Sequence, residues 1–113
     1  MANYREITSI EDWSAVLEAS ATKQQIVFKH STTCPVSANA LNELDAYLGS
    51  HVDADADFVL VKVIESRPVS NRIAEDLNVK HESPQIIAVR NKEKHWTASH
   101  WAITNEHITA VLD

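Results

Sequence analysis

Two apolar segments with the character of buried strands constrain the fold of this chain most. Residues 58–64 (FVLVKVI) are almost continuously apolar, and residues 25–30 (QIVFKH) form a shorter run of β-branched and aromatic side chains. Strands that are covered by helices on both faces have this character, whereas strands with one solvated face alternate apolar and polar residues. The two segments therefore predict the centre of a sheet that lies between two layers of helices.

The segments around these strands carry apolar residues at the spacing of amphipathic helices. We expect a first helix over residues 10–21, a second that opens at Pro35 and ends at Gly49, a third from Pro68, and a terminal helix capped by Thr104. Parallel strands need helical crossovers of this kind. The first two strands are therefore predicted to be parallel.

The last third of the chain predicts a hairpin. Pro84 precedes an expected strand over residues 85–89, and a polar turn at residues 91–94 leads to another over residues 95–100. The whole chain, residues 1–113, is therefore predicted to form one α/β domain. Its sheet is expected to be mixed, with four to five strands and helices on both faces. The acidic stretch at residues 50–57 is expected to be a connecting loop.

Charge and composition argue against several functions. The net charge is −6 and the ten Lys and Arg residues are scattered, so no surface for a nucleic-acid backbone is expected. Gly49 is the only glycine, whereas glycine-rich phosphate loops need several for their tight turns. Histidines 51, 95, 100 and 107 lack the spacing of metal ligands, so no metal site is expected.

The start of the chain and its cysteine content predict a location. The first residues, MANYREITSIEDW, mix charged and polar groups, and no segment approaches the ~20 apolar residues of a membrane span. Cys34 is the only cysteine, so the chain cannot form an internal disulfide. We therefore expect a cytoplasmic protein that has no membrane partner.

Cys34 is the residue whose position points most clearly to chemistry. It follows the first buried strand and opens a helix, with Pro35 at the favoured first helical position. Unpaired backbone N–H groups and the positive end of the helix dipole favour a thiolate there, and the thiolate is the nucleophile in disulfide exchange. The alternative is a buried and inert cysteine. A cysteine on the loop between such a strand and its helix is the thioredoxin-like arrangement.

Ser37 lies one helical turn after Cys34, where dithiol enzymes carry a resolving cysteine. Its hydroxyl can donate a hydrogen bond to the thiolate, but it cannot complete an internal disulfide. An external thiol must therefore resolve any mixed disulfide on Cys34. The predicted chemistry is monothiol, with Cys34 and Ser37 as the catalytic residues.

Other residues are candidates for binding the substrate. Thioredoxin-like folds place a cis-proline opposite the cysteine at the start of a strand, and the Ser83–Pro84 bond is the candidate for it. A trans proline that opens an edge strand is the alternative. His30 and His81 are expected to flank the site, either as imidazolium groups that stabilise the thiolate or as structural histidines.

Two segments, KHSTTCPVSANAL (29–41) and ESRPVSNRIAEDLNVKHESPQ (65–85), resemble the monothiol bacilliredoxins, the YtxJ-type proteins of the bacillithiol system. The resemblance extends over nearly the whole chain. It implies a thioredoxin-like fold, Cys34 as the active-site cysteine, and removal of bacillithiol from S-bacillithiolated protein cysteines. Bacillithiol would be a co-substrate and no cofactor would be bound. Partners would be S-bacillithiolated proteins and bacillithiol itself.

Bacillithiol carries carboxylates on its malate part, so a cation at the rim of the site would favour its binding. Arg67, at the head of the third helix, is the best-placed candidate, and a solvated helix-start cation is the alternative. The predicted substrate-binding residues are therefore Pro35, Arg67, Ser83 and Pro84.

Two other functions remain open. The first is a glutathione-dependent monothiol glutaredoxin or a related iron–sulfur carrier. The iron–sulfur carriers have glycine after the cysteine. This chain has Pro35 there, which lacks both that signature and a backbone N–H, and so argues against cluster binding. The other is a thioredoxin-fold interaction module that performs no exchange.

Overall fold

The computed structural model describes residues 4–51 and 55–112. Along the chain, its elements are β1 (Arg5–Glu6), α1 (Ile10–Ala19), β2 (Gln25–His30), α2 (Pro35–Ser50), β3 (Asp57–Lys62), α3 (Arg67–Leu77), β4 (Gln85–Arg90), β5 (Glu93–Ser99), the short 3₁₀ helix η1 (His100–Ala102) and α4 (Asn105–Leu112). The tip of the predicted acidic loop, residues 52–54, lies outside the described residues.

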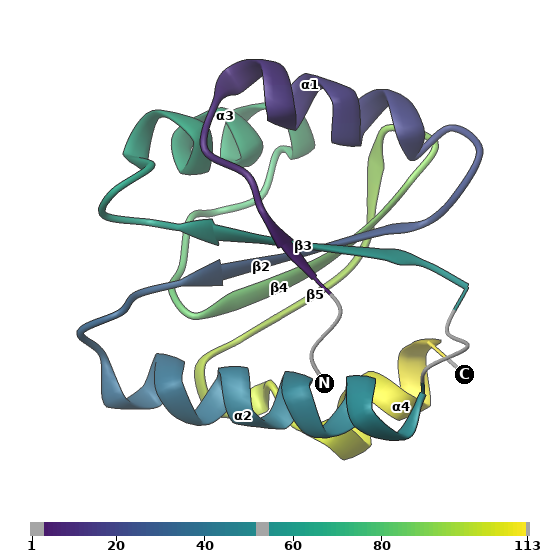
Figure 1. The fold of residues 1–113 in the computed structure, drawn as a ribbon. Coiled ribbons are helices and arrows are strands. Elements are labelled where there is room, and N and C mark those ends of the chain that lie inside the picture. The colour runs from purple at the N-terminus through teal and green to yellow at the C-terminus, as the bar shows by residue number, and fades with distance from the viewer. Residues whose placement is uncertain (1–3, 52–54, 113) are drawn as a thin grey trace.

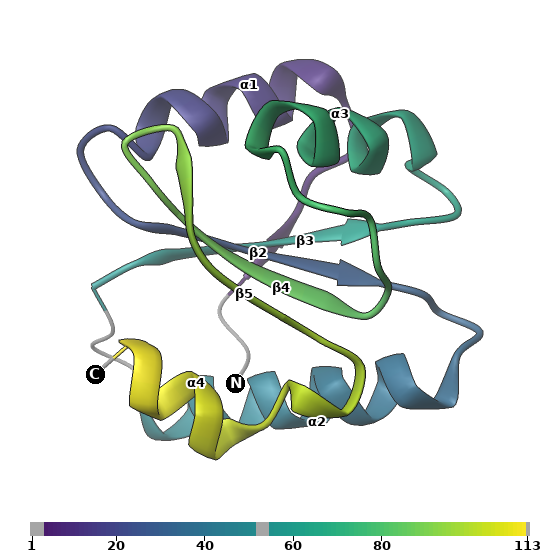
Figure 2. The ribbon, with the colours of Figure 1, turned by 180° about the vertical axis from the view of Figure 1, so that it is seen from behind.

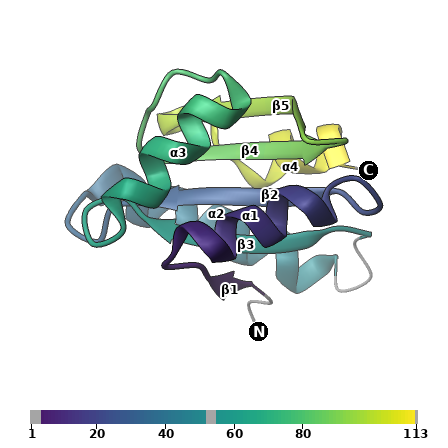
Figure 3. The ribbon, with the colours of Figure 1, turned by 90° about the horizontal axis from the view of Figure 1, so that it is seen from above.

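The strands form one mixed sheet in the order β1-β3-β2-β4-β5. β1, β3 and β2 are parallel, and β4 runs antiparallel to both β2 and β5. Helices α1 and α3 cover one face of the sheet, and α2 and α4 cover the other (Figures 1 and 2). Figure 3 shows β2 and β3 beneath α1 at the middle of the sheet. The predicted α/β architecture is therefore confirmed.

Side chains alternate along β2 between two hydrophobic cores. Val27 packs in the core under α1 and α3, whereas Ile26 and Phe28 pack in the core against α2 and α4. Because successive side chains of a strand point to opposite faces, the next two residues, Lys29 and His30, also belong to opposite faces. The end of β2 therefore supplies one polar side chain to each layer.

Several predicted boundaries differ from the structure by one or two residues: α1 ends at Ala19, α3 begins at Arg67, β4 ends at Arg90, and β5 is Glu93–Ser99. Two further differences have a visible cause. Gly49 does not end α2, because the side chains of the next two residues complete the helix. The hydroxyl of Ser50 donates to the carbonyl of Tyr47 at 3.2 Å, and Nδ1 of His51 donates to the same oxygen at 2.9 Å. The predicted turn at 91–94 is also too long, since Asn91 and Lys92 alone, both at positive φ, connect β4 to β5.

Candidate active site

Cys34 is the N-cap residue of α2, in extended conformation, and Pro35 is the first helical residue, as predicted. The thiol is half-buried, which contradicts the alternative of a fully buried, inert cysteine. The carbonyl of Cys34 accepts the first helical hydrogen bond, from Ala38 at 3.0 Å. The sulfur is thus carried at the N-terminal end of a sixteen-residue helix, beside backbone N–H groups that have no partner within the helix.

Ser37 is fully buried and is held by the loop before the helix. Its Oγ accepts a hydrogen bond from the Ser31 N–H at 3.0 Å and lies 2.7 Å from Nδ1 of His30. Within residues 4–51 and 55–112, no hydrogen bond reaches the sulfur of Cys34, so the predicted bond from the Ser37 hydroxyl is not formed here. Ser37 instead holds the loop that carries Cys34, residues 31–34, which we call the cysteine loop.

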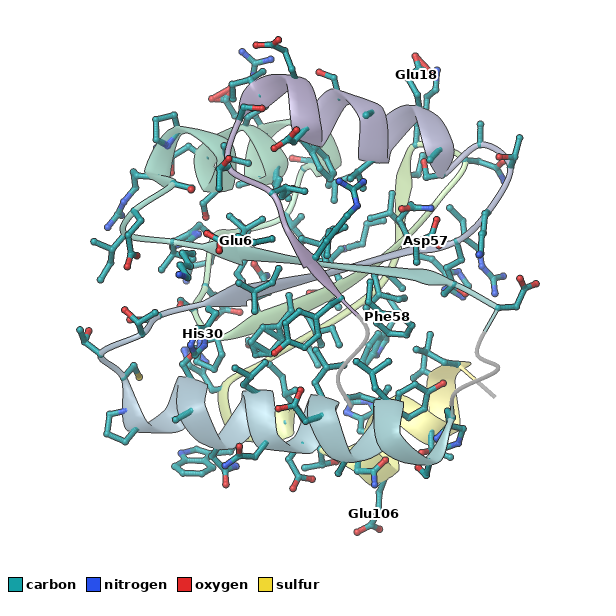
Figure 4. All side chains as sticks on the ribbon, viewed as in Figure 1. Glu6, Glu18, His30, Asp57, Phe58 and Glu106 are labelled. Atoms are coloured by element: carbon teal, nitrogen blue, oxygen red, sulfur yellow. The ribbon has the colours of Figure 1, made fainter. Side chains whose placement is uncertain are left out.

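His30 extends from the end of β2 toward the start of α2 (Figure 4). Burial lowers the pKa of His30, the positive charge of Lys62 lowers it further, and Glu65 acts in the opposite direction. The imidazole is therefore neutral at neutral pH. Of the two roles considered for His30, an imidazolium beside the sulfur is thus disfavoured, and its bond with Ser37 makes it structural.

The Ser83–Pro84 peptide bond is cis, as predicted. Pro84 is buried and precedes β4, whose first residue, Gln85, pairs with Lys29 near the end of β2. The carbonyl of Pro84 accepts a hydrogen bond from the backbone N–H of His100 at 3.0 Å. The hydroxyl of Ser83 is buried and has no hydrogen-bond partner, a state that native proteins rarely leave unexplained.

Arg67 is the first residue of α3 and is exposed. The loop before it is tied to the cysteine loop, because the Val63 N–H donates to the carbonyl of His30 at 2.9 Å and Thr32 Oγ1 lies 3.5 Å from a carboxylate oxygen of Glu65. The starts of α2 and α3 therefore meet at the same end of the sheet, at the left in Figure 1.

A buried lysine is the polar feature that sequence analysis missed. Lys29 is fully buried, and its Nζ donates to the carbonyl of Ser70 at 3.1 Å and to Nδ1 of His81 at 3.2 Å. Burial lowers the pKa of Lys29 to about 8. The signal was present in the sequence, since a lysine in a segment read as a buried strand must either reach solvent or find acceptors inside.

His81 was expected to flank the cysteine, but the structure holds it on the other face of the sheet, against β2 and α3. The Ser70 hydroxyl lies 3.3 Å from its Nδ1. The side-chain amide of Gln85 donates to the carbonyl of Lys80 at 3.1 Å and so anchors the same loop. We call Lys29, Ser70, His81 and Gln85 the buried polar cluster.

The surroundings of the site contain other informative features. Trp101 follows His100 in η1 and is 67% exposed, so it lies on the surface rather than in a core. Over the described ranges, no group of three or more His, Cys, Asp or Glu side chains has the geometry of a metal site. None of the helices in those ranges has the length and apolar character needed to cross a membrane.

Comparisons with known proteins agree with this geometry. A solved structure whose description proposes an oxidoreductase with a thioredoxin fold is 34% identical, with a TM-score of 0.84 over 96% of this chain and 92% of that one. Thioredoxin from Malassezia sympodialis is 15% identical, with a TM-score of 0.76 over 99% of this chain and 90% of that one. Thioredoxin O2 from Arabidopsis thaliana is 12% identical, with a TM-score of 0.77 over 98% and 96%.

The last two likenesses establish the thioredoxin-like fold. The family is given by a model described as "Monothiol bacilliredoxin BrxC", which matches residues 5–108. That range includes Cys34, Ser37 and the cis-proline loop, and the match agrees with the resemblance of the two sequence segments. The chain therefore belongs to the monothiol bacilliredoxin family and has the thioredoxin fold of the thiol–disulfide oxidoreductases.

Proposed function

We propose that this protein removes bacillithiol from S-bacillithiolated protein cysteines through a mixed disulfide on Cys34. One observation carries the proposal. The only sulfur available for exchange sits half-buried at a helix N-terminus, and a buried serine occupies the place of a second sulfur. Membership of the monothiol bacilliredoxin family supports the choice of bacillithiol as the thiol.

The reaction is written as two disulfide exchanges. The Cys34 thiolate attacks the bacillithiol sulfur of the modified protein, the original S–S bond breaks, and the protein cysteine leaves as a thiolate. A second bacillithiol thiolate then attacks the bacillithiol sulfur on Cys34. That step regenerates the Cys34 thiolate and releases bacillithiol disulfide. Electrons and sulfurs balance without any further oxidant or reductant.

Four residues are proposed to hold the substrate. Pro35 is exposed beside Cys34, and the Ser83–Pro84 segment lies next to the end of β2. Ser83 precedes the cis-proline, and we propose that its backbone pairs with the peptide of the bound thiol. Arg67 is proposed to pair with the malate carboxylates, because a guanidinium binds carboxylates with two parallel hydrogen bonds. No cofactor is needed for either step.

The test uses a bacillithiolated peptide and the wild-type protein. We expect release of the reduced peptide, one bacillithiol on Cys34 by mass spectrometry, and turnover only when free bacillithiol is added. Equal turnover with glutathione would instead indicate a glutaredoxin-like protein. No release with either thiol would indicate an interaction module.

A Ser37→Cys variant tests the monothiol assignment separately. The new thiol lies one turn from Cys34, so it should expel bacillithiol and leave an intramolecular disulfide, given Cα atoms within about 4.4–6.8 Å. The expected product is a protein two hydrogen atoms lighter with no adduct. A variant that keeps its bacillithiol adduct as long as wild type would contradict this account of residue 37.

A further inference from the structure

The buried polar cluster places a lysine where its charge is unfavourable. Lys29 is fully buried, and its two hydrogen-bond partners, a carbonyl and an imidazole nitrogen, are both uncharged. Within the described ranges, no carboxylate is within salt-bridge distance of its Nζ. A buried ammonium without an anionic partner costs stability. Its presence therefore calls for a role other than stabilising the fold.

The position of Lys29 determines which nitrogen of His81 carries the proton. Lys29 Nζ is a donor with no acceptor capacity, and it lies 3.2 Å from Nδ1 of His81. The Ser70 hydroxyl, 3.3 Å from the same nitrogen, is a second available donor. Nδ1 is therefore an acceptor, and the proton of the neutral ring is on Nε2. Lys29 thus fixes the tautomer of His81.

The charges that face His81 come from three elements. Lys29 belongs to β2, Arg67 to the start of α3, and Glu82 to the loop that carries His81. Burial lowers the pKa of His81, and the positive charges of Lys29 and Arg67 lower it further, against Glu82. The ring is neutral at neutral pH, half-exposed, and set among two cations and one carboxylate. An N–H donor in a net positive setting favours an anionic acceptor.

The loop that holds His81 leads directly into the proposed substrate-binding residues. His81 is two residues before Ser83 and three before Pro84, and Gln85 anchors the loop through Lys80. Arg67, the cation proposed to bind carboxylates, is near enough to His81 to act on its charge. β4 begins beside the end of β2, and the loop before α3 is bonded to the end of β2 as well. A ligand that reached from Cys34 past the cis-proline, around this end of the sheet, would therefore meet both groups.

We infer that His81 is a specificity residue, whose Nε2–H, held by Lys29, donates a hydrogen bond to a carboxylate of the small thiol on the disulfide substrate. The inference rests on the proposed function, because it concerns the ligand of that same site. Lys29 acts through His81 and is a positioning residue. Arg67 and His81 would then contact the anionic part of the ligand from two sides.

The first experiment measures the tautomer without any substrate. In ¹⁵N-labelled wild-type protein, NMR of the histidine rings should show His81 protonated at Nε2, with Nδ1 as an acceptor. Lys29→Met, which removes the donor but keeps an apolar chain of similar length, should mix the two tautomers and raise the pH at which His81 titrates. A wild-type ring protonated at Nδ1 would overturn the inference.

The second experiment compares two disulfide substrates in a single turnover. One peptide carries bacillithiol and the other carries cysteamine, which has no carboxylate. We expect His81→Ala to raise the concentration of bacillithiolated peptide needed for half-maximal rate by about tenfold, with the maximal rate little changed. The cysteamine peptide should be processed equally well by wild type and by His81→Ala. His81→Gln, which keeps an N–H donor, should recover part of the loss.

Controls separate the possible failures. His95 is exposed on β5, so His95→Ala should match wild type with both peptides. A His81→Ala variant that matches wild type, or that loses both substrates equally, would overturn this inference and leave the proposed function intact. A wild-type protein that processes neither peptide would overturn the proposed function, and the inference with it.

Discussion

Lys29 and His30 are neighbours at the end of β2, yet they serve opposite faces of the sheet and very different surroundings. On the face of α2, His30 contacts the buried hydroxyl of Ser37 in the loop that carries Cys34. On the face of α3, Lys29 brings a buried charge to the neutral ring of His81. The comparison indicates a division of work. The first face positions a sulfur without a fixed charge, and the second holds the charged groups that we propose to meet the ligand.

Removing the sulfur should have the largest effect. Cys34→Ala is expected to abolish release of the reduced peptide completely, because Cys34 is the only cysteine in the sequence. Urea denaturation should show a free energy of unfolding within about 1 kcal/mol of wild type, since the side chain is only half-buried. Residual exchange by the folded variant would break the comparison, because the chemistry would then not lie on the α2 face.

Removing the buried charge should stabilise the protein. Lys29→Met is expected to raise the free energy of unfolding at pH 7 by about 2–3 kcal/mol, because the folded-state pKa of about 8 lies below the unfolded value of 10.5. The unfolded chain binds the extra proton between these values, so wild-type stability rises through that window. Denaturation at pH 7, 9 and 10.5 should therefore show the advantage of the variant shrinking. An advantage that is independent of pH would contradict a buried charge at Lys29.

Removing the Ser37 hydroxyl, on the face of α2, should lower the stability of the protein. Ser37→Ala leaves the Ser31 N–H and the His30 ring without their buried partner, which should cost about 1–3 kcal/mol of unfolding free energy. Ser14→Ala is a matched control, because Ser14 is exposed on α1. Equal stability of the two variants in urea would show that the Ser37 bonds do not hold the cysteine loop.

Two arginines on α3 test whether a specific cation on the second face, the face of α3, contacts the substrate. Arg67 is at the head of the helix, and Arg72 is exposed further along it. Arg67→Ala should lower kcat/KM for a bacillithiolated peptide about threefold to tenfold, as expected for loss of one partly solvated charge contact. Arg72→Ala should leave it unchanged. An equal loss in both variants would indicate general attraction by net charge instead of a contact.

The smallest effect should be the acid dependence of stability. Burial is the main cause of the lowered pKa of both His30 and His81, so below about pH 6.5 the unfolded chain binds protons that the folded protein does not. Stability should therefore fall as the pH drops below that value. His30→Gln and His81→Gln should each flatten the slope of unfolding free energy between pH 6.5 and 5. Unchanged slopes would mean that both rings are protonated as easily in the folded protein as in the unfolded chain.

Local patterns were sufficient for most of the fold. Residues 25–30 were predicted as a strand with the observed ends, because β-branched and aromatic residues lie together there between polar flanks. The two-residue β1 and the three-residue η1 were missed, since neither is long enough to show a period. They form only where β3 and Pro84 provide partners distant in the sequence.

The site was predictable to the extent that it is local. Cys34 and Pro35 follow from helix-start chemistry alone. The partners of Ser37 and His81 do not, because they depend on which face of β2 each neighbouring residue occupies and on loops that meet only after folding. A strand-by-strand count of faces would have placed Lys29 under α3 and shown that a lysine was to be buried.

The exposed indole of Trp101 gives the molecule an intrinsic optical reporter. Trp13 is fully buried and Trp96 partly so, whereas Trp101 is 67% exposed and is joined to Pro84 through the backbone of His100. Iodide and other aqueous quenchers of tryptophan fluorescence should therefore reach Trp101 first. Shielding of this emission when a ligand or a protein is added would show that it settles beside Trp101. Binding could then be followed in real time on unlabelled protein, with Trp101→Phe as the control that lacks this emission.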